Sequence, residues 1–149
     1  MKLQKNEGGF TIIELLVVIL IIGLLSFLLI VTSSSFRQKE RNNERQTDIK
    51  ALHLQLEAYF AQNAKYPTLA NMNDANWRKS ALKSMENEGL KDPQGINEQL
   101  VDQPSKNAYS YEVKAADNSP CDNTTKDCTQ YILTATLEGS GTFTRNNTN

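Results

Sequence analysis

The chain has 149 residues, of which 39% are hydrophobic, and this length suits a single domain. Its 16 basic and 17 acidic residues leave a formal net charge of −1, which excludes the strongly basic surface of many nucleic-acid-binding proteins, and no nucleic-acid site is predicted. The sequence has no glycine-rich phosphate loop, no His-Glu-x-x-His run and no close Cys–His pair, so an enzyme is not expected.

An apolar segment follows a short basic leader that ends in two glycines. Over residues 12–31, only Glu14, Gly23 and Ser26 interrupt the aliphatic and aromatic side chains. A run of about 20 such residues is enough for a helix to cross the hydrocarbon core of a bilayer. The sequence therefore predicts a transmembrane helix over residues 10–31.

Glu14 is the unusual residue of this segment. An unpaired carboxylate in hydrocarbon is costly, so an acid in a membrane helix is expected to have a partner and a function. A cleaved secretory signal is one alternative, but its apolar region has only about 7–15 residues and ends at an Ala-x-Ala-like site, which is missing after Val31. An ordinary single-pass anchor is a second alternative, and it would leave Glu14 and the Gly-Gly-Phe junction without a role.

The stretch GGFTIIELLVVILIIGLLSFLLI, which begins at Gly8, resembles the N-terminal signature of the type IV pilin and type II secretion pseudopilin family. Members of this family are made as prepilins. The resemblance implies that a prepilin peptidase removes residues 1–9 by cutting between Gly9 and Phe10, and that it methylates the new amino group of Phe10. It also implies that Glu14 pairs with the N-terminal amine of a neighbouring subunit in a helical filament, since a buried acid is tolerated only when it is paired.

The same resemblance sets the expected topology and surroundings of the chain. Basic residues lie on both sides of the apolar segment, so charge alone does not orient it. The family implies a precursor that crosses the cytoplasmic membrane once, with its N-terminus in the cytoplasm and residues 32–149 outside as a pilin head. After assembly, the subunit would lie in a cell-surface filament, where other copies of residues 10–31 replace the lipid. Besides other copies of the chain, the implied partners are the peptidase, an assembly ATPase and its membrane platform.

The first helix is expected to continue into the head as far as about residue 64. After the polar residues 33–45, apolar residues recur at spacings of three and four, which is typical of a helix that buries one face. The X-Pro sequence at Tyr66–Pro67 disfavours helical geometry and predicts that the helix ends just before it. A second, short helix is expected over about 74–88, with Asp74 as its N-cap. The apolar stripe of the first helix consists of Ile49, Leu52, Leu56, Tyr59 and Phe60.

The C-terminal part predicts a small antiparallel sheet over about residues 107–145. Apolar and polar residues alternate from Tyr109 and again from Tyr131, a pattern typical of half-buried strands. The glycines at 139 and 141 predict a turn, followed by a short edge strand over residues 142–144. A long N-terminal helix packed against one face of this sheet gives an α+β, pilin-like fold.

Cys121 and Cys128 enclose six residues, and an even number of cysteines in an exported domain favours a disulfide between them. Three acids lie close to this loop in the sequence, Asp117, Asp122 and Asp127, and their oxygens are of the kind that Ca²⁺ prefers. Because major pseudopilins bind calcium in a C-terminal loop, the resemblance makes these carboxylates calcium candidates. A solvated acidic loop without metal is the alternative, and no other cofactor is expected.

The resemblance implies a structural subunit and not an enzyme. The main hypothesis is a major pilin of a type IV pilus, polymerised through its N-terminal helix and serving adhesion, twitching motility or DNA uptake. A pseudopilin of a type II secretion-like system is the alternative. The order of three short motifs, YPT at 66–68, DPQG at 92–95 and YSY at 109–111, is similar to that of major pseudopilins, whereas the disulfide loop near the C-terminus favours a pilus fibre. A third hypothesis is a membrane-anchored extracellular binding domain that does not polymerise.

Overall fold

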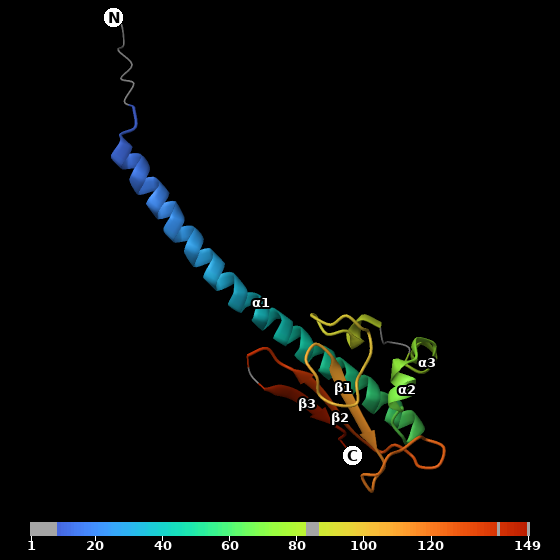
Figure 1. Cartoon of the computed structure of the whole chain (residues 1–149). Helices are drawn as coiled ribbons and strands as arrows, with labels where there is room; N and C mark the ends of the chain where they lie inside the picture. Colours follow the sequence, from blue (N-terminus) through green and yellow to red (C-terminus); the bar gives the residue numbers. More distant parts are fainter. Residues whose placement is uncertain (1–8, 83–86, 140, 149) are drawn as a thin grey trace, which may run out of the picture. The chain divides into compact units, whose positions relative to one another are not determined.

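The computed structural model of the chain describes residues 9–82, 87–139 and 141–148, and it leaves the side chains of residues 29–33, 87 and 88 undescribed. The chain divides into two compact units, with the boundary between Lys39 and Glu40. Helix α1, Ile12–Asn63, contributes to both units (Figure 1). We refer to the unit that starts at Glu40 as the head.

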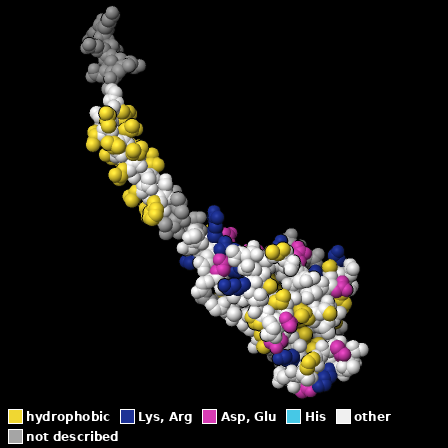
Figure 2. All heavy atoms as spheres, viewed as in Figure 1, with side chains coloured by type: hydrophobic (Ala, Val, Ile, Leu, Met, Phe, Trp, Pro, Cys, Tyr) yellow, Lys and Arg dark blue, Asp and Glu magenta, His cyan; other side chains and the backbone are white. Residues whose placement is uncertain are grey.

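The N-terminal unit consists of the first half of α1 and the residues just before it. Every large apolar side chain described between Phe10 and Leu28 is exposed, and Figure 2 shows hydrophobic side chains along the visible face of this part of the helix. Within the described ranges, no helix is long and apolar enough to cross a membrane. The transmembrane assignment of residues 10–31 stays a prediction, and residues 1–8 of the expected leader lie outside the described residues.

The head is an α+β unit in which the second half of α1 packs with a small antiparallel sheet. The sheet has the order β1-β2-β3, so β2 is central and the other two strands form its edges. In this register Tyr111 lies opposite Leu133, and Ala135 lies opposite Phe143. The α+β class and the antiparallel sheet predicted from the sequence are confirmed. The strands are β1, Tyr109–Lys114, β2, Gln130–Thr136, and β3, Thr142–Asn146.

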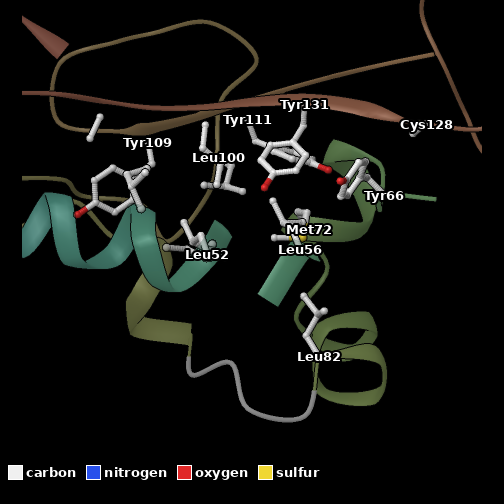
Figure 3. Packing of buried hydrophobic residues seen from close by; sticks show 14 residues of the cluster. Leu52, Leu56, Tyr66, Met72, Leu82, Leu100, Tyr109, Tyr111, Cys128 and Tyr131 are labelled. Carbon is white, nitrogen blue, oxygen red and sulfur yellow. The ribbon is translucent and has the colours of Figure 1, made fainter. Parts of the chain in front are cut away.

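The core of the head lies between α1 and the sheet. Ile49, Leu52 and Leu56 are almost fully buried, which confirms the predicted apolar stripe. In Figure 3 the aromatic side chains of β1 and β2 lie beside these leucines, and the rings of Tyr66 and Tyr131 meet edge to face at 4.6 Å. Burying each such side chain contributes about 1.5–3 kcal/mol relative to leaving it exposed, so this contact supplies most of the apolar stabilisation of the head.

The predicted end of α1 agrees with the structure. The last helical residue is Asn63, and Ala64 follows with a left-handed φ of 57°. The N–H of Ala64 still donates to the carbonyl of Phe60 at 2.7 Å, which satisfies one of the free carbonyls at the helix end. The chain then leaves helical geometry before Pro67, as X-Pro sequences require.

The helix expected over residues 74–88 is shorter in the structure. Helix α3 spans Ala75–Ala81, and Asp74 caps it as predicted, because its carboxylate accepts the N–H groups of residues 76 and 77. The helix ends where Leu82 leaves helical geometry and buries its side chain in the core. Residues 83–86 lie outside the described part of the chain, and a 3₁₀ turn, η1, covers Asn87–Leu90.

One helical turn was not predicted. Helix α2, Leu69–Asn73, comes directly before α3. Thr68 and Asn71 form a capping box at its start, each side chain bonding to the other residue's backbone N–H. Two asparagines in five residues give a weak local helix signal, so the reciprocal cap is what sets this turn.

One ion-pair cluster links α1 to the turn before β1 and to the turn after β2. Arg45 lies on α1 one turn before the apolar stripe, and only 1% of its side chain is exposed. Its Nε and Nη2 atoms donate to the two carboxylate oxygens of Asp92 at 2.6 and 2.9 Å. Its Nη1 atom donates to Glu138 at 2.8 Å and to Asn42 at 3.1 Å, while Nη2 also donates to Gln94. A buried ion pair offsets its desolvation cost only with such complete hydrogen bonding.

A second arginine completes this Arg45 cluster. The Nε and Nη2 atoms of Arg41 donate to the two oxygens of Glu138, each at 2.6 Å. The hydrogen bonds from Arg41, and then those from Arg45, lower the pKa of Glu138 to about 2. The amide side chain of Asn42 bonds to both backbone groups of Glu138. The turn after β2 is therefore attached to α1 through side chain and backbone together.

The turn that contains Asp92 requires its glycine. The N–H of Gly95 donates to the carbonyl of Asp92 at 2.7 Å. A Cβ atom at Gly95 would lie only 2.7 Å from the carbonyl oxygen of Asn107. The close packing of this turn places Asp92 against Arg45.

Replacing Arg45 with methionine should lower the free energy of unfolding by about 3–5 kcal/mol, because the carboxylate of Asp92 would stay buried without its charged partner. The measurement is urea unfolding of the full chain in detergent micelles, followed by the fluorescence of Trp77, which packs against Tyr59 in the head. The exposed neighbour Lys91 supplies the control, since Lys91→Met should change the free energy by less than about 0.5 kcal/mol. Equal stability of Arg45→Met and the unaltered chain would contradict the role assigned to the Arg45 cluster.

Candidate functional site

The expected cleavage point is open to a partner in the N-terminal unit. Gly9 is exposed, and a Cβ atom built on it would meet nothing within 4 Å. The side chain of Phe10 is 85% exposed. Both residues of the expected cleavage point are therefore exposed in the described structure, and cleavage and methylation here stay predictions.

Glu14 has a local partner that the sequence analysis missed. The carboxylate Oε2 accepts from the backbone N–H and from the hydroxyl of Thr11, both at 2.8 Å, and the hydroxyl accepts the N–H of Glu14 at 3.3 Å. This is a capping box at the start of α1, and the sequence Thr-x-x-Glu before an apolar run is its known signal. The other carboxylate oxygen, Oε1, accepts no hydrogen bond within residues 9–82, 87–139 and 141–148. The carboxylate therefore caps the helix and keeps one oxygen for another donor.

The apolar side chains on both sides of Glu14 are exposed in the described part of their own unit. From Ile12 to Leu28 they are between 44% and 81% exposed, all around the helix. Such an extended apolar surface marks a protein or membrane contact. Gly23, inside this surface, has open space where a side chain would be. We define residues 10–28 as the assembly segment.

The disulfide predicted between Cys121 and Cys128 is present, with Cα atoms 5.2 Å apart. Asn123 inside the loop donates from Nδ2 to the carbonyl of Tyr66 and accepts the N–H of Cys128 at Oδ1. The N–H of Tyr66 donates in turn to the carbonyl of Cys128 at 2.7 Å. The loop is therefore attached to the segment that follows α1.

The three carboxylates considered for calcium do not form a metal site. Among the described residues, no group of three or more His, Cys, Asp or Glu side chains could hold a metal ion. Asp117 accepts from Lys126, and this charged hydrogen bond holds the pKa of the Asp117 carboxyl well below its usual range. Asp122 accepts the backbone N–H groups of residues 124–126, which lower its pKa in the same direction. Asp127 lies 3.2 Å from the ammonium group of Lys65, so each acid has its own partner.

A hydroxyl network lies between α1 and the sheet. Glu57 accepts the hydroxyls of Tyr66, Tyr131 and Thr148 at 3.1, 2.8 and 2.6 Å. Partial burial acts to raise the pKa of Glu57, but these hydrogen bonds outweigh it and the pKa is lowered. The hydroxyl of Tyr131 also lies 2.6 Å from Nδ1 of His53. His53 is half-buried in this network.

The sequence matches the family described as "Prokaryotic N-terminal methylation motif" over residues 4–30. It is 35% identical over 70 residues to the type IV major pilin protein PilA of Myxococcus xanthus, which is 47% of this chain and 32% of that protein. It is also 35% identical over 66 residues to the type II secretion system core protein G of Dickeya chrysanthemi, which is 44% of this chain and 43% of that protein. The resemblance of the N-terminal segment to pilins and pseudopilins is therefore confirmed.

The extent of these matches differs between relatives. The chain spans only 32% and 43% of the length of the first two. The core protein G of Pseudomonas aeruginosa matches over 108 residues at 29% identity, which is 72% of this chain and 75% of that protein. We found no solved structure that matches the chain. The relatives include a type IV major pilin and type II secretion system core proteins, and they do not separate a pilin from a pseudopilin.

Removing the disulfide should destabilise the head by about 2–3 kcal/mol, because the unfolded chain regains the freedom of the closed loop. The double variant Cys121→Ser/Cys128→Ser is compared with the unaltered chain by urea unfolding in micelles, with and without a reductant. The reductant should lower the stability of the unaltered chain and leave that of the double variant unchanged. A reductant effect of equal size on both proteins would contradict this role of the disulfide.

Proposed function

We propose that this chain is a major pilin, the repeating subunit of a type IV pilus filament, and that it polymerises through the assembly segment. The observation that carries the proposal is the uncovered apolar surface of residues 10–28, which begins beside an acid and lies within the matched methylation motif. An apolar helix surface that is exposed over this length requires lipid or other protein around it. A filament core made of the same helix from many copies supplies that surrounding.

In the proposed assembly pathway, this chain contributes its apolar segment, its cleavage point and the new amino group of Phe10. The precursor lies in the cytoplasmic membrane with its head outside, and its apolar segment of residues 10–31 contacts lipid. A prepilin peptidase cuts after Gly9 and methylates the amino group of Phe10. An assembly ATPase and its membrane platform then move the subunit from lipid into the filament, where it is held at the cell surface. Catalysis in this scheme belongs to the partners.

Glu14 would select the position of each new subunit. A carboxylate in an apolar filament core is costly unless a cation pairs with it. The amino group created at Phe10 of the neighbouring copy is such a cation. Because Thr11 occupies only Oε2, the free Oε1 oxygen is able to accept the incoming amine while the helix stays capped. Glu14 is therefore able to cap its own helix and to pair with the neighbouring subunit at the same time.

A pseudopilin of a type II secretion-like system is the second candidate. The match to core protein G over 108 residues favours it, because that match extends well beyond the N-terminal motif and into the head. A pseudopilin would use the same assembly segment in a short filament that is not recovered from the cell surface. The two candidates therefore differ in the location of the filament: a pilus extends from the cell surface, whereas a pseudopilin filament does not.

The proposal is tested by the intact mass and N-terminal sequence of the protein sheared from its own cells. We expect filaments made of a chain that starts at methylated Phe10. Gly9→Val should block processing and leave the full 149-residue chain in membranes, because the added side chain obstructs the approach of the peptidase. Gly23→Val is the control, since its position is equally open and should not affect cleavage.

The outcomes of this test are distinct. Mature protein found in membranes but absent from sheared filaments would favour the pseudopilin. A chain that still starts at Met1 would contradict both candidates and leave the tethered binding domain.

Glu14→Ala should permit processing but reduce filament yield by more than about tenfold, because the intersubunit pair is lost. Thr11→Ala is the matched control. It removes the capping partner, at a cost of about 0.5–2 kcal/mol in helix stability, and leaves the carboxylate in place. Filament yield is measured by shearing and immunoblotting, and processing is measured by intact mass. Equal losses in both variants would mean that Glu14 acts only as a helix cap.

A further inference from the structure

One edge of the head presents positive charge around a groove. The groove has a volume of about 690 Å³ and lies between α1 and β3. Lys50 and His53 line it from the helix and Arg145 lines it from the strand, with exposed Leu54 as an apolar contact. No Asp or Glu is among its described lining residues. We call Lys50, His53 and Arg145 the basic surface.

Lys50 and Arg145, the two cations of the basic surface, have no anionic partner in the described part of the head. Lys50 and Arg145 both lie over the ring of Phe143, at 5.6 and 4.9 Å from its centroid. Cation–ring contacts hold the side chains in place without neutralising their charge. Glu57, the acid nearest to His53 in the hydroxyl network, already accepts three hydroxyls. The basic surface therefore remains available for an acidic partner.

The opposite edge of the sheet presents negative charge. A second groove of about 510 Å³ lies beside β1, and Asp102, Glu112 and Asp122 line it, with no Lys or Arg among its described lining residues. Asp102 is exposed and forms no ion pair within the described ranges. Asp122 bonds to backbone N–H groups, which keep it ionised but do not cancel its charge. Glu112 pairs with Lys114, which is not among the lining residues of this groove. We call the three acids the acidic surface.

The two surfaces cannot meet within one head, because they belong to opposite edges of the same sheet, β3 and β1. We propose that the basic surface of one subunit binds the acidic surface of a second copy of this chain. Each groove also has apolar lining residues, so the two surfaces offer apolar contact as well as opposite charge. These residues are Leu54 in the first groove and Leu69, Val113 and Pro120 in the second. When two different surfaces of identical subunits bind each other, every added subunit leaves one surface open for the next. Such a contact produces an open helical filament unless the rotation between subunits closes a ring.

This inference rests on the proposed function and adds a contact between heads to the contact between assembly segments. Apart from Glu14, the assembly segment exposes apolar side chains all around the helix, so these side chains give little selection of rotation about the helix axis. Opposite charges on two edges of the head supply that selection, because wrong arrangements bring like charges together. The head contact therefore determines how successive subunits are rotated.

The test reverses charges in the full chain in its own cells. Arg145→Glu should reduce the yield of sheared filaments about tenfold, and so should Asp102→Lys. The combination Arg145→Glu/Asp102→Lys should restore most of the yield, because the opposite charges face each other again. Lys79→Glu is the control for a change of charge alone, since Lys79 lies on α3 and lines neither groove.

A crosslinking measurement gives a second readout that does not depend on yield. In filaments of the Arg145→Cys/Asp102→Cys double variant, oxidation should produce a ladder of covalent multimers. Each single variant should produce none, because two copies of the same surface do not meet. The unaltered chain, with its two cysteines already joined, is the background control.

The outcomes separate this inference from the proposed function. If the unaltered chain forms no filaments, the proposed function fails and this inference fails with it. If filaments form but Arg145→Glu keeps full yield and the double cysteine variant forms no ladder, only this inference is overturned. If Arg145→Glu keeps full yield and loses binding of a duplex DNA probe, the basic surface serves a polyanion and the inference is also overturned.

Discussion

The buried guanidinium of Arg45 is the interaction on which the arrangement of the head depends. Removing a charge from water is costly, and only a geometry that satisfies all of its donors offsets that cost. Asp92 and Glu138, from two turns far apart in sequence, meet Arg45 within 3 Å. Apolar packing alone would tolerate a helix rotated or shifted along the sheet, but this cluster does not. It therefore specifies where α1 lies relative to both turns.

The N-terminal unit differs from the head in how far its apolar side chains are buried and its carboxylates are paired. In the head, the large apolar residues of α1 and the sheet are mostly buried, and the carboxylates of the disulfide loop have local partners. Among the described residues of the N-terminal unit, apolar side chains remain exposed and Glu14 hydrogen-bonds only to Thr11. An exposed apolar surface of this extent marks a contact with protein or lipid, which is the basis of the proposed function.

Local signals predicted most of the secondary structure. The stripe of Ile49, Leu52 and Leu56 identified the buried face of α1, and Pro67 marked its end, because both depend on residues close in sequence. The alternating residues of β1 and β2 identified the strands for the same reason. Helix α2 was missed since a single turn has too few residues for periodicity, and its capping box was the available signal. The Thr11–Glu14 cap was also visible in the sequence and was missed.

The sequence by itself determined the register of the N-terminal motif, the buried face and the end of α1, the three strands of the head and the pairing of its two cysteines. Only the tertiary structure decided which charges are buried and which have partners. Arg45 looked like one more residue of a polar segment, and its burial depends on acids 47 and 93 positions away. Asp117, Asp122 and Asp127 looked like a cluster, yet each bonds to a different group. Electrostatic roles depend on distances between side chains, and those distances exist only once the chain is folded.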